Sequence, residues 1–114
     1  MQGCIFCRIV NREIPADVVY EDDHILAFRD VNPMAPVHIL LIPKKHIATL
    51  FDLEEGDERI LGRLQRAAVQ VARDLGLAER GFRLVTNCLE GGGQVVFHVH
   101  YHLLAGRDLK WPPG

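Results

Sequence analysis

One stretch of the sequence repeats its apolar residues at helical spacing, and this feature restricts the fold more than any other. Within residues 52–75 apolar side chains recur three and four positions apart, as in an amphipathic α-helix. They are Ile60, Leu61, Leu64, Ala68, Val71, Ala72 and Leu75. Asp52 and Glu55 resemble a capping box, and Gly76 is a typical stop. We therefore predict one long helix whose apolar stripe is buried against another element.

The remaining apolar stretches have the composition of β-strands. β-Branched, aromatic and aliphatic residues predict strands over residues 18–21, 24–29, 37–46, 82–87 and 95–104. The first two flank polar residues and predict a β-hairpin, while two prolines in residues 30–36 exclude a helix there. Residues 5–10 are expected to form one or two helical turns. The predicted fold class is α+β, with an antiparallel sheet covered by one principal helix.

Length, charge and cysteine content limit the classes of protein to consider. A chain of 114 residues fits a single domain, residues 1–114. The net charge of −2 provides no basic surface for nucleic acid or membrane, and the longest apolar run, residues 39–43, is too short to cross a bilayer. No signal-peptide pattern is recognisable at the N-terminus, so we expect a cytoplasmic protein. The three cysteines are then reduced thiols or metal ligands rather than a disulfide framework.

Three histidines alternate with apolar residues in HVHYH, residues 98–102. On a strand, His98, His100 and His102 would point to one face. Convergent imidazoles can bind a metal, act as a nucleophile or donate protons near neutral pH. A phosphoryl group bound there could be attacked by the central imidazole. The preceding GGGQ, residues 91–94, could offer backbone amides to phosphate oxygens, although such a loop is more often a plain turn.

Two further features could carry chemistry. Cys4 and Cys7 form a C-x-x-C pair, which suits half of a tetrahedral zinc site but equally two buried thiols or a redox pair. Cys88 has no partner at metal-binding spacing and is interpreted as structural. Asp30, before the proline-rich turn, could cap that turn or accept ribose hydroxyls. The apolar residues Ile5, Phe6, Ile9 and Phe28 suit a core or one wall of a base pocket.

Together these stretches resemble the histidine triad (HIT) superfamily, whose signature is HxHxHxx with apolar x. The resemblance covers nearly the whole chain and is greatest to the Hint branch, the nucleoside phosphoramidate hydrolases. The stretches that carry it are CIFCRIV, FRDVNPMAPVHILLIPKKHI, Asn87, GGQ and the terminal WPPG. The fold that this resemblance implies is an α+β meander.

The resemblance also implies roles for individual residues. His100 would be the nucleophile, His102 and His38 would orient it and its protonation, and His98 would support the site. Asp30 would bind the ribose hydroxyls of a purine nucleotide, an AMP or GMP derivative. The purine pocket would be lined by Ile5, Phe6, Ile9, Phe28 and Val31, and the residues around the α-phosphate would be Asn87, Gly93 and Gln94. In zinc-type bacterial members the metal ligands correspond to Cys4, Cys7, His46 and His98, which would make zinc structural.

The family forms homodimers through the long helix and the strand before the triad, with the tail, residues 111–114, reaching toward the partner's site. One position departs from the pattern: Val95 stands near the leaving group, where Hint proteins have serine or another polar residue. The implied activity is hydrolysis of purine nucleoside 5′-phosphoramidates through a nucleotidyl-histidine. The alternatives are a dinucleoside polyphosphate hydrolase, a nucleotidyl transferase, or a zinc-bound nucleotide-sensing module with vestigial catalysis.

Overall fold

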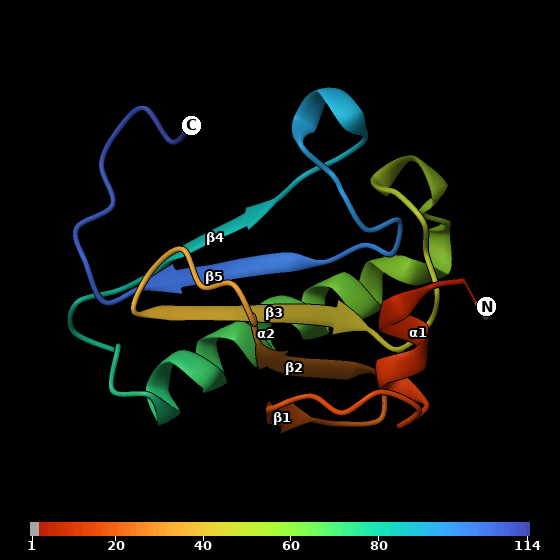
Figure 1. Cartoon of the computed structure of the whole chain (residues 1–114), viewed down its shortest axis with the longest axis horizontal. Coiled ribbons are helices and arrows are strands. Elements are labelled where there is room, and N and C mark those ends of the chain that lie inside the picture. The colour runs from red at the N-terminus through yellow and green to blue at the C-terminus, as the bar shows by residue number, and fades with distance from the viewer. Residues whose placement is uncertain (1–2) are drawn as a thin grey trace.

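The computed structural model describes residues 3–114 and contains one five-stranded antiparallel sheet with one long helix (Figure 1). The strands are β1 (Val18–Glu21), β2 (Ile25–Arg29), β3 (Val37–Pro43), β4 (Arg83–Thr86) and β5 (Tyr101–Ala105), in the spatial order β1-β2-β3-β5-β4. The helices are α1 (Ile5–Val10) and α2 (Glu58–Asp74), with 3₁₀ turns at Leu50–Asp52, Glu55–Asp57 and Glu90–Gly92. The predicted α+β fold class is confirmed.

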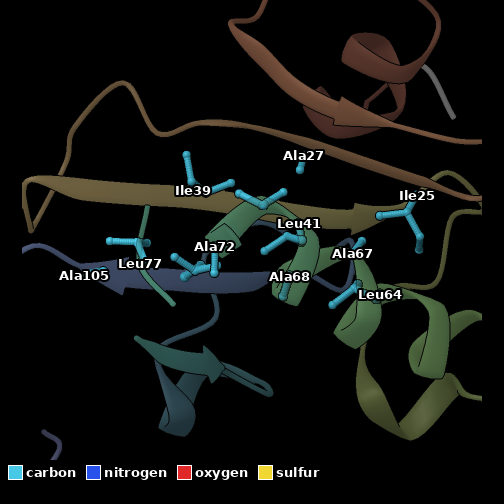
Figure 2. Close-up of a cluster of buried hydrophobic side chains, with 12 residues drawn as sticks. Ile25, Ala27, Ile39, Leu41, Leu64, Ala67, Ala68, Ala72, Leu77 and Ala105 are labelled. Carbon is cyan, nitrogen blue, oxygen red and sulfur yellow. The ribbon is translucent and has the colours of Figure 1, made fainter. Parts of the chain in front are cut away.

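The helix α2 covers one face of the sheet, where the largest buried cluster lies (Figure 2). Odd-numbered residues of β2 and β3 point to this helix, because side chains alternate along a strand. The sheet contributes Ile25, Ala27, Ile39, Leu41, Leu103 and Ala105, and the helix contributes Leu64, Ala67, Ala68, Val71 and Ala72. The amphipathic stripe read from the sequence is therefore the buried face of α2.

The opposite face of the sheet carries a smaller buried cluster, which α1 covers at one end. Phe6 of α1 packs with Leu26, Phe28, Leu40 and Ile42. Strand β3 is thus apolar on both faces, which explains why its sequence shows an uninterrupted apolar run instead of alternation. No helix within residues 3–114 has the length and hydropathy needed to span a membrane.

The predicted start of the long helix was wrong, whereas its end was correct. The helix begins at Glu58, and two 3₁₀ turns, Leu50–Asp52 and Glu55–Asp57, precede it. Asp52 belongs to a capping box with Thr49, whose N–H it accepts at 3.0 Å, and not with Glu55. Gly76 follows the helix with a φ of +76°, the left-handed conformation that favours glycine.

The last predicted strand was also too long. Residues 95–100 lie outside the sheet, and β5 begins only at Tyr101. Strand β4 pairs with β5 only as far as Thr86, and β3 pairs with β5 only as far as Leu41, both opposite Tyr101. The Val99 N–H instead donates to the carbonyl of Ile47 at 2.7 Å. His98 and His100 therefore lie outside the ladder, and of the three histidines only His102 belongs to it.

Candidate functional site

Two histidines from neighbouring strands meet on the sheet face opposite α2. In the register of β3 and β5, His38 pairs with Leu104, and His102 pairs with Leu40. Their side chains meet across the strands, with His38 Nε2 2.8 Å from His102 Nδ1. His38 is buried and His102 is partly buried. The pair joins strands that are distant in sequence.

The hydrogen bonds determine where the protons of this pair lie. The Met34 N–H donates to His38 Nδ1 at 3.0 Å, so Nδ1 must accept and the proton of His38 must be on Nε2. That proton is donated to His102 Nδ1, which leaves the proton of His102 on its own Nε2. Both imidazoles are thereby fixed as neutral Nε2–H tautomers.

The environment favours these neutral forms. Burial is the largest influence on His38 and lowers its pKa, although the Asp30 carboxylate acts in the opposite direction. Burial also lowers the pKa of His102 to about 4, with further lowering by His100 and His38. Near neutral pH, His102 is therefore an uncharged hydrogen-bond donor.

His100 is oriented differently and keeps a free lone pair. Its Nδ1 lies 2.8 Å from the carbonyl oxygen of His98, and since a carbonyl only accepts, the proton is on Nδ1 and the lone pair on Nε2. The ring forms a T-shaped contact with the Phe6 ring, with centroids 5.1 Å apart. The Thr86 hydroxyl donates to the His100 carbonyl at 2.8 Å. An imidazole held in this tautomer can act as a nucleophile through Nε2.

A second cluster brings together the four residues that the resemblance suggested as zinc ligands. The ligand atoms of Cys4, Cys7, His46 and His98 all lie within 4.8 Å of one another. His98 Nδ1 is 3.4 Å from Cys4 Sγ and 3.3 Å from His46 Nδ1, and His46 Nδ1 is 3.2 Å from Cys7 Sγ. Two sulfurs and two imidazole nitrogens are a donor set typical of tetrahedral zinc.

The protonation of His98 suits a metal ligand. His98 has no exposed surface, and its Nε2 lies 2.7 Å from the carbonyl oxygen of Pro43. Its proton is therefore on Nε2, and the Nδ1 lone pair points to the cysteines and His46. Such a carbonyl contact commonly orients metal-binding histidines. Burial, followed by the neighbouring Cys4, raises the pKa of Cys7 to about 11, and a bound cation would reverse this effect because thiolates are the ligands.

Asp30 lies at the end of β2, and its two carboxylate oxygens have different surroundings. Oδ1 accepts the Asn32 N–H at 2.8 Å, so Asp30 does cap its turn. Oδ2 lies 3.4 Å from His38 Nε2.

The residues predicted for a base pocket differ in exposure. Phe6 and Phe28 are buried, with ring centroids 5.6 Å apart. Ile9 is partly buried against that cluster, and Ile5 and Val31 are exposed, Val31 to 91%.

The side chain of Gln94 stabilises the glycine-rich loop, residues 91–94, by hydrogen bonds. Its side-chain oxygen accepts the Leu89 N–H at 2.8 Å, and its nitrogen donates to the carbonyls of Ala48 at 2.8 Å and Val96 at 3.1 Å. The Gln94 side chain therefore shapes the loop. A Cβ at Gly93 would lie 3.8 Å from the Asn87 amide nitrogen, so these two predicted residues are close together.

Val95 follows this loop and is 84% exposed. It lines an open groove next to the four-residue cluster, together with Gly3, Cys4, Ile5, His46, Val96 and Phe97. Cys88 is a free cysteine outside the cluster.

The sequence did not reveal the groups that fix the tautomers. The Met34 amide and the Pro43 carbonyl belong to the backbone, so no residue type marks them. The Thr86 hydroxyl could have been noticed only from the pairing of β4 with β5.

Comparison with known proteins gives a consistent result. A profile of the HIT domain matches residues 11–109. The chain is 54% identical to an uncharacterized HIT-like protein of Synechococcus elongatus over 113 residues, which are 99% of this chain and 98% of the relative. The crystal structure of a HIT family hydrolase from Legionella pneumophila has a TM-score of 0.96 and 54% identity, covering 98% of this chain and 100% of that one. A histidine triad protein from Clostridium difficile has a TM-score of 0.93 and 46% identity, covering 96% of each chain.

Proposed function

Because the chain belongs to the HIT domain family, we propose that it is a hydrolase of purine nucleoside 5′-phosphoramidates that works through a nucleotidyl-histidine. The observation that carries this proposal is the tautomer of His100. Its Nδ1–H is held by the His98 carbonyl at 2.8 Å, so the Nε2 lone pair is available to phosphorus. The similar Legionella protein is named a HIT family hydrolase, which supports hydrolysis as the reaction class.

The reaction proceeds in two steps. His100 Nε2 attacks the α-phosphorus, the phosphorus–nitrogen bond breaks, and the departing nitrogen takes a proton from solvent and leaves as the amine. Water then attacks the phosphorus of the adduct, gives a proton back to solvent, displaces His100 Nε2 and yields the nucleoside monophosphate. The Nε2–H of His102 can donate to a phosphoryl oxygen as negative charge develops, an interaction worth a few kcal/mol in favourable sites. His38 supports that donor by keeping the His102 proton on Nε2.

The nucleoside is bound at the edge of the same sheet face. Asp30 Oδ2 can accept a ribose hydroxyl, since only Oδ1 is used by the backbone turn. The purine ring would lie against the Phe6 and Phe28 cluster, with Ile5, Ile9 and Val31 around it. Asn87, Gly93 and the backbone that Gln94 braces would surround the α-phosphate. Val95 would face the leaving group from the groove that it lines.

We propose that Cys4, Cys7, His46 and His98 hold a structural zinc ion. When bound, zinc would supply a rigid tetrahedral link between α1, the segment after β3 and the triad segment. Metal analysis of Cys4→Ser should show loss of zinc, while Cys88→Ser, the matched control outside the cluster, should retain it. Equal zinc content in the two variants, or less than about a tenth of an equivalent in the unmodified protein, would refute the site.

The protein is further proposed to be a cytoplasmic homodimer of single-domain subunits. β4 is the last strand of the sheet, and its outer edge has no strand partner among residues 3–114. A second copy could pair along that edge. Light scattering after size-exclusion chromatography measures the mass directly, and a monomer at micromolar concentration would refute this part of the proposal.

The activity test uses adenosine 5′-phosphoramidate as substrate. We expect the unmodified protein to release AMP, His100→Ala to lose at least about a thousandfold in rate because no nucleophile remains, and intact-mass spectrometry to detect an AMP adduct. His24→Ala is the matched control, because His24 is exposed in the turn before β2. Turnover by His100→Ala at the rate of His24→Ala would refute the mechanism. Tight AMP binding without turnover by the unmodified protein would instead favour the nucleotide-sensing module. Cleavage of dinucleoside polyphosphates, with no cleavage of the phosphoramidate, would favour a dinucleoside polyphosphate hydrolase.

A further inference from the structure

The turn that follows β5 touches the loop between β2 and β3. Arg107 Nη2 donates a hydrogen bond of 3.1 Å to the carbonyl oxygen of Met34. Gly106 has a φ of +92°, and a Cβ at this position would lie 2.8 Å from Cβ of Pro36. No other residue fits there without displacing the loop, because the space is too small and the backbone conformation suits glycine. Gly106 and Arg107 together form a contact that we call the clamp.

The loop held by the clamp carries the group that fixes the histidine pair. The Met34 N–H donates to His38 Nδ1 at 3.0 Å, while the Met34 carbonyl accepts from Arg107. His38 Nε2 in turn lies 2.8 Å from His102 Nδ1. The backbone of Met34 therefore links an exposed arginine, bound at its carbonyl, to the buried His38, bound at its N–H. Neither Gly106 nor Arg107 belongs to the proposed catalytic or nucleotide-binding residues.

We propose that Gly106 and Arg107 are positioning residues: they hold the Met34 amide against His38 and so keep the protons of His38 and His102 on Nε2. If the amide moved away, His38 could carry its proton on Nδ1, and its Nε2 lone pair would then face His102. His102 would then change tautomer, carry its proton on Nδ1 and donate it to His38 Nε2. Its Nε2 would become a lone pair, which repels a phosphoryl oxygen instead of donating to it.

The catalytic consequence rests on the proposed function, whereas the tautomers can be observed without any substrate. Imidazole ¹⁵N NMR distinguishes a protonated from an unprotonated ring nitrogen. In the unmodified protein His38 should show a bare Nδ1 and a protonated Nε2. In Arg107→Ala and Gly106→Ala we expect a mixture of tautomers at His38. Arg107→Lys can still donate one hydrogen bond to the carbonyl and should restore most of the original spectrum.

The matched control for the clamp is Arg80→Ala. Arg80 is another exposed arginine near the same turn, but its contact there is an ion pair of 3.8 Å to Asp108 rather than a bond to Met34. It should keep the original tautomers and rate. With adenosine 5′-phosphoramidate, Arg107→Ala should lower kcat by about 3- to 10-fold and change KM less than twofold, as expected when part of the protein loses the His102 Nε2–H donor that acts in the transition state.

The two readouts separate the possible failures. Unchanged His38 tautomers in a folded Arg107→Ala protein would overturn the clamp, whether or not the Gly106→Ala protein folds. A tautomer change without a fall in kcat would overturn the positioning role. If the unmodified protein does not hydrolyse the phosphoramidate at all, the proposed function fails, and the NMR result still decides whether the clamp sets the tautomers.

Discussion

Replacing Phe6 by alanine tests whether α1 is anchored as the structure shows. Phe6 is 6% exposed and packs in the smaller core cluster. Its ring also forms T-shaped contacts with the rings of Phe28, His98 and His100, with centroid distances of 5.6, 5.9 and 5.1 Å. A buried Phe→Ala change costs about 3–5 kcal/mol. We expect about 3 kcal/mol, because a helix as short as α1 can shift to fill part of the space.

The assay is urea unfolding followed by far-UV circular dichroism, with EDTA present so that metal binding does not add to stability. With an m-value of about 1.5 kcal/mol/M, a loss of about 3 kcal/mol lowers the midpoint by about 2 M. Phe51→Ala is the matched control, because Phe51 is 82% exposed. That variant should change the free energy of unfolding by no more than about 0.5 kcal/mol.

A third variant separates burial from ring contacts. Phe6→Leu keeps an apolar side chain but removes the ring, so its cost should fall to about 1–1.5 kcal/mol. Since Cys4 and Cys7 flank Phe6, the alanine variant should also bind zinc more weakly than Phe51→Ala does. A free energy of unfolding for Phe6→Ala within about 1 kcal/mol of that for Phe51→Ala would refute the packing of α1 on the sheet.

Three other measurements test separate parts of the structure. Folding lowers the pKa of His102 from its ordinary value of 6.5 to about 4, so the unfolded chain takes up more protons as the pH falls through this window. Between pH 7.5 and 5.5, with EDTA present, protonation at this site should lower the free energy of unfolding by on the order of 1 kcal/mol. The His102→Gln variant should show a weaker pH dependence of stability. Val95→Ser supplies a hydroxyl near the proposed leaving group and should raise kcat on phosphoramidates by up to about tenfold; an unchanged kcat would remove the role of Val95. Leu64, with no exposed surface, should lose about 3 kcal/mol on change to alanine, whereas the half-exposed Val69 should lose less than about 1 kcal/mol.

The sequence predicted the fold class well because its strongest signals are periodic. The stripe that includes Leu64 and Val71 predicted a helix with one buried face, and that face is buried against the sheet. The alternation of HVHYH was less reliable, because of the three histidines only His102 lies on strand β5. The start of α2 could not be found in this way. Asp52 lies three positions from both Thr49 and Glu55, and only the backbone conformation decides which partner completes the capping box.

The site was predicted less completely for a related reason. Residue types reveal imidazoles and thiols, but the proton positions depend on backbone groups. The Met34 amide makes His38 an Nε2–H tautomer, and the Pro43 carbonyl does the same for His98. The Gln94 side chain accepts from the Leu89 N–H and donates to the Ala48 carbonyl, two contacts that residue type alone does not predict. Such contacts are decided by tertiary packing and leave no pattern in the sequence.

The alternation of HVHYH gives each histidine a different partner. His98 joins the cluster of Cys4, Cys7 and His46, and His102 joins His38. The His100 ring instead contacts the rings of Phe6 and His102. The connection runs through the backbone, because the carbonyl of His98 is the group that orients the His100 ring. Any change that frees the His98 side chain should therefore also move that carbonyl. A metal at the four-residue cluster would in this way influence the lone pair of His100 without touching a phosphate.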